Sequence, residues 1–115
     1  LKSDKKDRVY ELRSYESATE KIFANKVQMF NDGNEVGIFQ RLGFNAIFYG
    51  EVLAGSKMPN LMYMTSFENM DDRNNHWKAF SADAEWKKLS ALPEYQQNVS
   101  HIDIVLMNPA TYSDF

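Results

Sequence analysis

The sequence contains no cysteine among its 115 residues. It therefore has no disulfide, no thiolate nucleophile and no cysteine-ligated zinc, so that packing alone must stabilise the fold. It also has no run approaching the about 18 consecutive apolar residues that a membrane-spanning helix needs. The opening segment, LKSDKKDR, lacks both Met and an apolar signal core. We expect a soluble chain and leave its compartment open.

The chain also has no excess of positive charge, because its formal net charge is −3. No segment combines clustered Lys or Arg with stacking aromatic residues on an expected strand, so nucleic acid is not an expected partner. A Gly-rich phosphate loop, a nucleophile elbow and a carboxylate metal loop are all missing. We therefore predict no metal and no cofactor from sequence motifs.

Apolar residues make up 43% of the chain, aromatic residues 14% and charged residues 25%, which is typical of a packed globular domain. A chain of 115 residues builds one hydrophobic core rather than two. We expect residues 1–7 to be a charged leader or linker, because they lack periodicity, and residues 8–115 to form a single domain.

The first half of the chain alternates between strand and helix signals. Residues 9–15 (VYELRSY) alternate with period two and predict a strand. Ser17 and Glu20 have the spacing of a capping box, so a helix is expected to begin there. Apolar residues then recur at helical spacing, and polar residues fill the opposite face. The apolar positions are Ile22, Phe23, Val27 and Phe30, and the polar positions are Lys21, Asn25, Lys26 and Gln28.

Turn residues at 32–34 (DGN) predict a broken helix that resumes over residues 35–42. Gly43 stands where a left-handed helix end favours glycine. Residues 44–54 and 61–68 then predict a hairpin of two strands.

The second half of the chain repeats the helix and strand pattern. Asn69 is expected to cap a helix that buries Met70, Trp77 and Phe80, and Asp83 is expected to cap a short second helix. Residues 100–107 predict the last strand.

This order of elements predicts an α+β fold of the ferredoxin-like kind, βαββαβ, with an antiparallel four-stranded sheet in the order 4-1-3-2. Two helices cover only one face of such a sheet, yet apolar residues alternate onto both faces. Phe48 and Met62 are expected on one face, and Tyr49 and Tyr63 on the other. An exposed apolar face predicts a homodimer through the sheet, with a barrel cavity able to hold a small molecule.

Three segments resemble the NIPSNAP family, whose domains form dimeric α/β barrels. They are VYELRSY, IFQRLGF and MYMTSFENMDDRNNHWKAFSADAEWKKL, and the resemblance covers nearly the whole chain from Arg8. The sequence departs from the family by carrying Ala84 where proline is frequent. Some proteins similar to this one carry two such domains in tandem, so the resemblance is compatible with this chain being the second half of a longer protein. The resemblance implies a fold and leaves the function open.

Ionisable residues on two neighbouring strands are the candidate site. Glu11 and Arg13 share a face of the first strand, and His101 and Asp103 share a face of the last. In an enzyme, His101 acts as a base oriented by Asp103, Arg13 binds an anionic group, Glu11 tunes the site and Tyr63 supplies a hydroxyl. The alternative interpretation is an ion-pair network at the dimer face or at a wet barrel rim.

His76 beside Trp77 is a further ligand-binding candidate, because other dimeric α/β barrels include haem-binding enzymes. His76 has no neighbour three or four residues away able to complete a metal site, so a structural or solvent-facing histidine is the alternative, and haem is not predicted. Two functions therefore stay open. One is a non-catalytic domain for binding or protein interaction, and the other is a small-molecule enzyme of the monooxygenase or isomerase type that uses the barrel cavity.

Overall fold

A computed structural model of the chain describes residues 2–52, 60–95 and 101–112. Its elements follow one another in the predicted order, and both helical segments are divided in two, as the turn at residues 32–34 and the cap at Asp83 predicted. They are the 3-10 turn η1 (Lys5–Asp7), β1 (Val9–Glu16), α1 (Glu20–Asn31), α2 (Glu35–Arg41), β2 (Asn45–Glu51), β3 (Asn60–Phe67), α3 (Met70–Ala82), α4 (Ala84–Ser90), the 3-10 turn η2 (Pro93–Tyr95) and β4 (His101–Met107).

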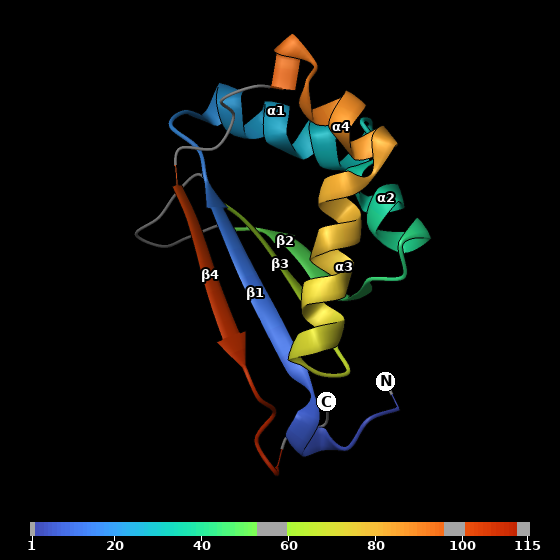
Figure 1. The fold of residues 1–115 in the computed structure, drawn as a ribbon. Coiled ribbons are helices and arrows are strands. Elements are labelled where there is room, and N and C mark those ends of the chain that lie inside the picture. Colours follow the sequence, from blue (N-terminus) through green and yellow to red (C-terminus); the bar gives the residue numbers. More distant parts are fainter. Residues whose placement is uncertain (1, 53–59, 96–100, 113–115) are drawn as a thin grey trace.

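The four strands form one antiparallel sheet in the order β2-β3-β1-β4. This is the predicted order, and the α+β ferredoxin-like fold is confirmed. All four α-helices lie on one side of the sheet, with α3 running along the strands and α1 crossing near the end of β1 (Figure 1). The sheet and helices are therefore two layers with one face of the sheet left open among the described residues.

The core lies between these two layers and is mainly aromatic. Tyr63 is 0% exposed, and its ring packs against Tyr15 and Phe39 with ring centroids 5.5 and 5.7 Å away. Phe39 also stacks on Phe80 of α3 at 4.8 Å. Ring pairs of this kind add to the free energy gained by burying apolar area, so they hold α2 and α3 firmly on the sheet.

Two of the three predicted helix N-cap residues are confirmed. Asn69 accepts a hydrogen bond from the Asp72 amide at 2.8 Å, and Asp83 accepts one from the Trp86 amide at 3.0 Å. The cap predicted at Ser17 is wrong. Thr19 caps α1 instead, because its hydroxyl accepts from the Ile22 amide at 3.1 Å while Ser17 is buried before the helix begins.

The turn at residues 32–34 separates α1 from α2, as predicted. Asn34 adopts a left-handed backbone with φ of 68°, a conformation that asparagine tolerates better than most residues. Gly43 has φ of +80° at the end of α2, which confirms the position predicted for glycine. These two bends aim α2 across the sheet, where it contributes to the site described below.

The open face of the sheet carries apolar side chains, and the predicted division between the faces is confirmed. Tyr49 pairs with Tyr63 on the helix side, whereas Phe48 pairs with Met64 and is 43% exposed. A hollow of about 450 Å³ on this open face is lined by Tyr10, Ile47, Phe48, Met64, Met107, Asn108, Pro109 and Ala110. No helix in the described part of the chain is long and apolar enough to cross a membrane.

The segment before β1 contacts the domain through Glu68. The backbone amides of Lys2 and Ser3 donate to its carboxylate at 2.6 to 3.0 Å. Hydrogen bonding from Ser3 and from Lys2 holds the pKa of Glu68 at about 2, below its ordinary value of 4.5. The division into a leader over 1–7 and a domain over 8–115 stays a prediction.

Candidate functional site

A cavity of about 380 Å³ between the sheet and the helices contains most of the ionisable groups near the core. We call it the helix-side pocket. Its lining residues come from β1, α1, α2, α3, α4 and β4. They are Arg13, Tyr15, Lys26, Glu35, Phe39, Arg73, Trp77, Phe80, Ser81, Trp86 and Ile102. The volume is within the range of small-molecule sites, which begins at about 300 Å³.

Glu11 lies beneath this pocket and is completely buried. Its carboxylate accepts from Nε of Arg13 at 2.6 Å, from Nε of Arg73 at 2.8 Å and from the indole of Trp77 at 2.9 Å. Arg73 adds a second bond through Nη2 at 3.2 Å. Burial raises the pKa of Glu11, but the hydrogen bonds from Arg73 and the charge of Arg13 outweigh burial and hold the pKa below 4.5. Glu11 is therefore a buried anion that fixes two guanidinium groups and an indole.

Arg13 connects this anion to a pair of tyrosines. Its Nη1 donates to the Tyr15 hydroxyl at 3.2 Å, and that hydroxyl is 2.8 Å from the hydroxyl of Tyr63. The guanidinium carbon also lies 3.8 Å from the ring centre of Trp77, a cation–π contact. Burial raises the pKa of both tyrosine hydroxyls, which keeps them protonated as hydrogen-bond donors rather than bases.

Lys26 and Glu35 form a second buried pair at the pocket wall. Nζ of Lys26 lies 3.3 Å from a Glu35 carboxylate oxygen, and the side chains are only 6% and 2% exposed. The prediction that Lys26 belongs to the polar face of its helix is wrong. Position 26 follows Phe23 by three residues and precedes Phe30 by four, so it lies on the apolar stripe, and this spacing is the sequence signal that the prediction overlooked.

Burial dominates the protonation of this pair. It lowers the pKa of Lys26, and Glu35 only partly opposes that effect. It raises the pKa of Glu35, against the charges of Lys26 and Arg13. Both groups are thus shifted toward their neutral forms in a medium of low dielectric constant.

The predicted meeting of Glu11 and Arg13 with His101 and Asp103 does not occur. The register pairs Arg13 with Ile104, whereas Asp103 is opposite Ser14 and His101 is opposite Glu16. Paired residues share a face, so odd-numbered positions of β1 face the same way as even-numbered positions of β4. Glu11 and Arg13 therefore face the helices, and position 103 faces the open side.

The other candidates predicted from the sequence, Tyr63, His76 and Trp77, lie in different places. Trp77 lines the pocket, and Tyr63 lies behind it. His76 is elsewhere, with Nδ1 2.8 Å from the Asp72 carbonyl and its ring against Phe44 and Phe67. Nδ1 is also 3.0 Å from an Asp72 carboxylate oxygen, so the prediction that His76 has no suitable neighbour four residues away is wrong. Among the residues that the structure describes, no three His, Asp or Glu side chains come together to hold a metal ion.

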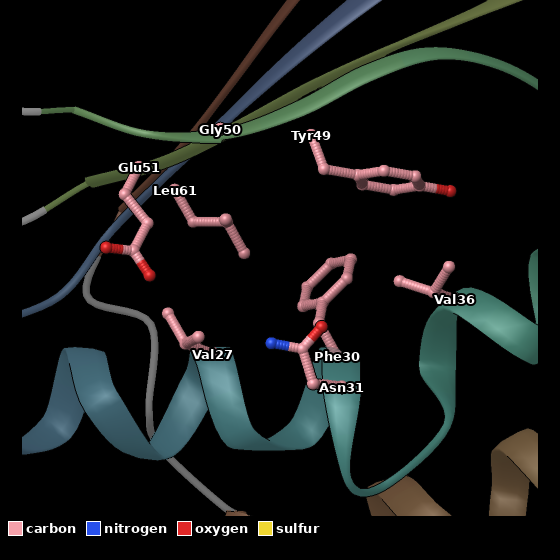
Figure 2. Close-up of a pocket in the computed structure, with 8 residues that line it drawn as sticks. All are labelled: Val27, Phe30, Asn31, Val36, Tyr49, Gly50, Glu51 and Leu61. Carbon is pink, nitrogen blue, oxygen red and sulfur yellow. The ribbon is translucent and has the colours of Figure 1, made fainter.

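A second hollow of about 290 Å³ lies between α1, α2 and β2. Figure 2 shows the eight residues around it, Val27, Phe30, Asn31, Val36, Tyr49, Gly50, Glu51 and Leu61. In this view the Tyr49 hydroxyl points away from Glu51, and the lining residues include no cation. Because this hollow lacks paired charges, the helix-side pocket is the better candidate for binding a polar ligand.

Comparison with known protein families shows which family this chain belongs to. A model of the NIPSNAP family matches residues 10–114. The chain belongs to the NIPSNAP family. This confirms the resemblance found in the sequence, and the matched range includes all of the four strands except Val9, together with all the residues of the helix-side pocket. No curated protein matches the chain.

Solved structures of other NIPSNAP proteins share this fold. An uncharacterised NIPSNAP-like domain protein from Burkholderia xenovorans has a TM-score of 0.82 at 17% identity, covering 94% of this chain and 90% of its own. A NIPSNAP family protein of unknown function from Agrobacterium tumefaciens has a TM-score of 0.78 at 22% identity, covering 99% and 98%. A monooxygenase of Streptomyces coelicolor, in complex with the ligand nanaomycin D, has a TM-score of 0.59 at 18% identity, covering 93% and 91%. At these identities the comparisons describe the fold alone.

Proposed function

We propose that this NIPSNAP domain is a non-catalytic binding module whose helix-side pocket holds a small molecule with an anionic group. The observation that carries the proposal is the charge of the pocket region. Three cations, Arg13, Lys26 and Arg73, accompany the two carboxylates of Glu11 and Glu35. One positive charge is left over, in a partly enclosed site where a carboxylate gains more from it than in water.

The guanidinium groups also have room for a ligand. Arg13 uses Nε and Nη1 for Glu11 and Tyr15, and its Nη2 has no hydrogen-bond partner among the described residues. The Arg13 and Arg73 side chains are 15% and 20% exposed, so both are accessible from the pocket. Fixed guanidinium donors suit carboxylate recognition, because a ligand finds them already oriented.

Aromatic rings form the rest of the pocket wall and favour a flat apolar body on the ligand. Phe80 stacks on Phe39 at 4.8 Å and packs against Trp86 in a tilted arrangement at 4.5 Å, and Trp77 meets Phe80 edge-on at 5.4 Å. A few polar groups within a mainly aromatic wall is the usual composition of a small-molecule site. We therefore choose 2-naphthoate, which has fused rings and one carboxylate, as the test ligand.

Charge at the pocket mouth is expected to control binding of 2-naphthoate. Ile102 of β4 lines the pocket and is 48% exposed. Ile102→Glu should weaken binding by about tenfold and Ile102→Lys should strengthen it, since one charge near the site changes the binding free energy by about 1.4 kcal/mol. The two indole N–H signals of the chain, from Trp77 and Trp86, report binding in a heteronuclear NMR titration, because both residues line the pocket.

Ile104 provides a matched control for this experiment. It lies on the same strand and the same face, is 47% exposed and does not line the pocket. Ile104→Glu should leave the affinity unchanged within about twofold. Equal losses in both glutamate variants, or unchanged indole signals with the original chain, would contradict binding in the helix-side pocket.

We further propose that the chain forms a homodimer through the open face of its sheet. Phe48 and Val105 are 43% and 47% exposed on this face, next to the hollow that contains Met64 and Met107. A contiguous apolar surface of this kind is unusual on a monomer, and self-association is the simplest way to cover it. Two such faces would enclose the barrel cavity predicted from the sequence.

Val105→Asp is expected to convert the dimer to a monomer, because it places a charge on the apolar face that the dimer buries. Leu106 is the matched control, since it is 45% exposed and points to the helix side. Leu106→Asp should keep the dimeric mass. Sedimentation velocity at micromolar concentration measures both variants, and a strictly monomeric original chain would refute the dimer.

Catalysis in the same pocket is the second candidate function. It is favoured by the fold shared with a monooxygenase that was solved with a bound ligand, and by the Tyr15 and Tyr63 hydroxyls that continue from Arg13. An oxygenase should consume oxygen when a hydroxylated naphthoate is added. If the bound compound is recovered unchanged under air and no oxygen is taken up, the oxygenase function is excluded and only the binding function remains.

A further inference from the structure

We propose that Lys26 captures carbonyl compounds as a covalent imine, so that the ligands of the helix-side pocket are oxo acids or aldehydes that carry a carboxylate. This inference rests on the proposed binding function and names its ligand class. It is carried by one buried amine that lines a pocket, beside a buried carboxyl group, in a pocket that two guanidinium groups also line.

The surroundings of Lys26 favour a nucleophilic amine. Its Nζ lies over the rings of Phe30 and Tyr15, at 4.8 and 5.3 Å from their centres, and 3.6 Å from the sulfur of Met29. Burial lowers the pKa of Lys26, which increases the share of neutral amine near neutral pH. By contrast, Lys21, Lys78, Lys87 and Lys88 are exposed.

Glu35 supplies the acid that this chemistry needs. It is 2% exposed, its carboxylate oxygen is 3.3 Å from Nζ, and burial raises its pKa. Moving the proton from Lys26 to Glu35 gives a neutral amine next to a neutral carboxylic acid. The exchange removes two charges from a low-dielectric site, which makes it less costly there than in water.

The step balances with these two groups alone. The lone pair of Nζ forms a bond to the carbonyl carbon, and the carbonyl oxygen takes the proton of Glu35. The carboxylate then removes a proton from nitrogen and returns it to the hydroxyl, which leaves as water while a C=N double bond forms. The products are a protonated imine, one water and the Glu35 carboxylate, so the ion pair between positions 26 and 35 is restored.

Arg13 and Arg73 would hold the carboxylate end of the same ligand. Both line the pocket with Lys26, and both are fixed by Glu11. A ligand carboxylate on these groups leaves its carbonyl free to approach the amine, and the aromatic wall accommodates a ring. Phenylpyruvate has all three parts and is the compound for the test.

The experiment is reductive trapping of the intact chain. Phenylpyruvate and sodium cyanoborohydride are added, the adduct is measured by intact mass, and peptide mapping locates it. Hydride transfer to the imine carbon gives a secondary amine, heavier than the chain by the acid less one oxygen atom. We expect one adduct, at Lys26, and an at least fivefold slower reaction when 2-naphthoate fills the pocket. Labelling spread over the exposed lysines and insensitive to 2-naphthoate would overturn the inference.

Two variants separate chemistry from folding. Lys26→Arg keeps a cation beside Glu35 but forms no imine, so it should bind 2-naphthoate and give no adduct at position 26. Lys78→Arg, an exposed change on α3, should leave the trapping unchanged. If the indole signals shift with 2-naphthoate but Lys26 is never labelled, the carbonyl inference fails and the binding function stands. If neither occurs, both fail.

Discussion

Glu11→Gln is expected to lower the free energy of unfolding by about 3 to 5 kcal/mol, the usual loss when one partner of a buried ion pair is removed. The amide keeps the shape of Glu11 but leaves the guanidinium groups of Arg13 and Arg73 without their counter-charge. A domain of this size has a stability of only about 5 to 15 kcal/mol, so a large part of it depends on this residue. Urea unfolding followed by tryptophan fluorescence measures the change.

Glu51→Gln is the control for that experiment, because Glu51 is an exposed carboxylate on β2. Its effect should remain within about 0.5 kcal/mol. Equal urea midpoints for Glu11→Gln and the original chain would show that the network around Glu11 does not stabilise the fold.

The stability of the original chain should also fall in acid. The pKa of Glu11 is lower in the folded state than its ordinary value of 4.5, because the hydrogen bonds of Arg73 and the charge of Arg13 outweigh burial. A carboxyl group with a lowered pKa stabilises the fold above the unfolded pKa, and this contribution is lost as the pH falls through the folded pKa. The loss therefore begins below about pH 4.5 and should be much smaller in Glu11→Gln.

Replacing either member of the Lys26–Glu35 pair alone with an apolar residue should destabilise the fold by about 3 kcal/mol or more, whereas replacing both should not. The pair is buried at 3.3 Å, so each single change leaves one ionisable group in an apolar site without its partner. In Lys26→Met/Glu35→Leu no charge remains to be buried, and its stability should equal or exceed that of the original chain. A double-mutant cycle of urea unfolding measures the coupling.

The two single variants should differ in the sign of their pH dependence. In Lys26→Met, Glu35 keeps a raised pKa, so the contribution of Glu35 to stability is greatest below about pH 4.5 and is lost as the pH rises through the folded pKa. In Glu35→Leu, Lys26 keeps a lowered pKa, so stability rises with pH toward 10.5. Additive losses in the cycle, or parallel pH profiles, would contradict the buried pair.

Features that depend on neighbours along the chain were predictable from the sequence. The period-two strands, the caps at Asn69 and Asp83 and the glycine at position 43 all follow from local backbone chemistry, and the structure agrees. Thr19 replaces Ser17 as the cap of α1 because two hydroxyl residues compete for the same role within one turn, and local preference does not separate them.

The candidate site was predicted only in part. Glu11, Arg13 and Trp77 were identified from the sequence and do meet, but Arg73 was missed because it reaches Glu11 across 62 positions of sequence. Lys26 was assigned to the polar face because of its charge, although its spacing matches the apolar stripe. No motif links Lys26 to Glu35, since the turn that brings α2 back toward α1 lies between them.

The sequence by itself determined the order of the elements, the strand arrangement and the presence of apolar side chains on both faces of the sheet. These follow from periodicity, which each segment carries alone. Only the tertiary structure decided the pairing register between neighbouring strands. This register places Asp103 opposite Ser14, while Arg13 faces the helices. The reason is that register is set by packing between distant segments, and a slip of one residue reverses the face of every side chain in a strand.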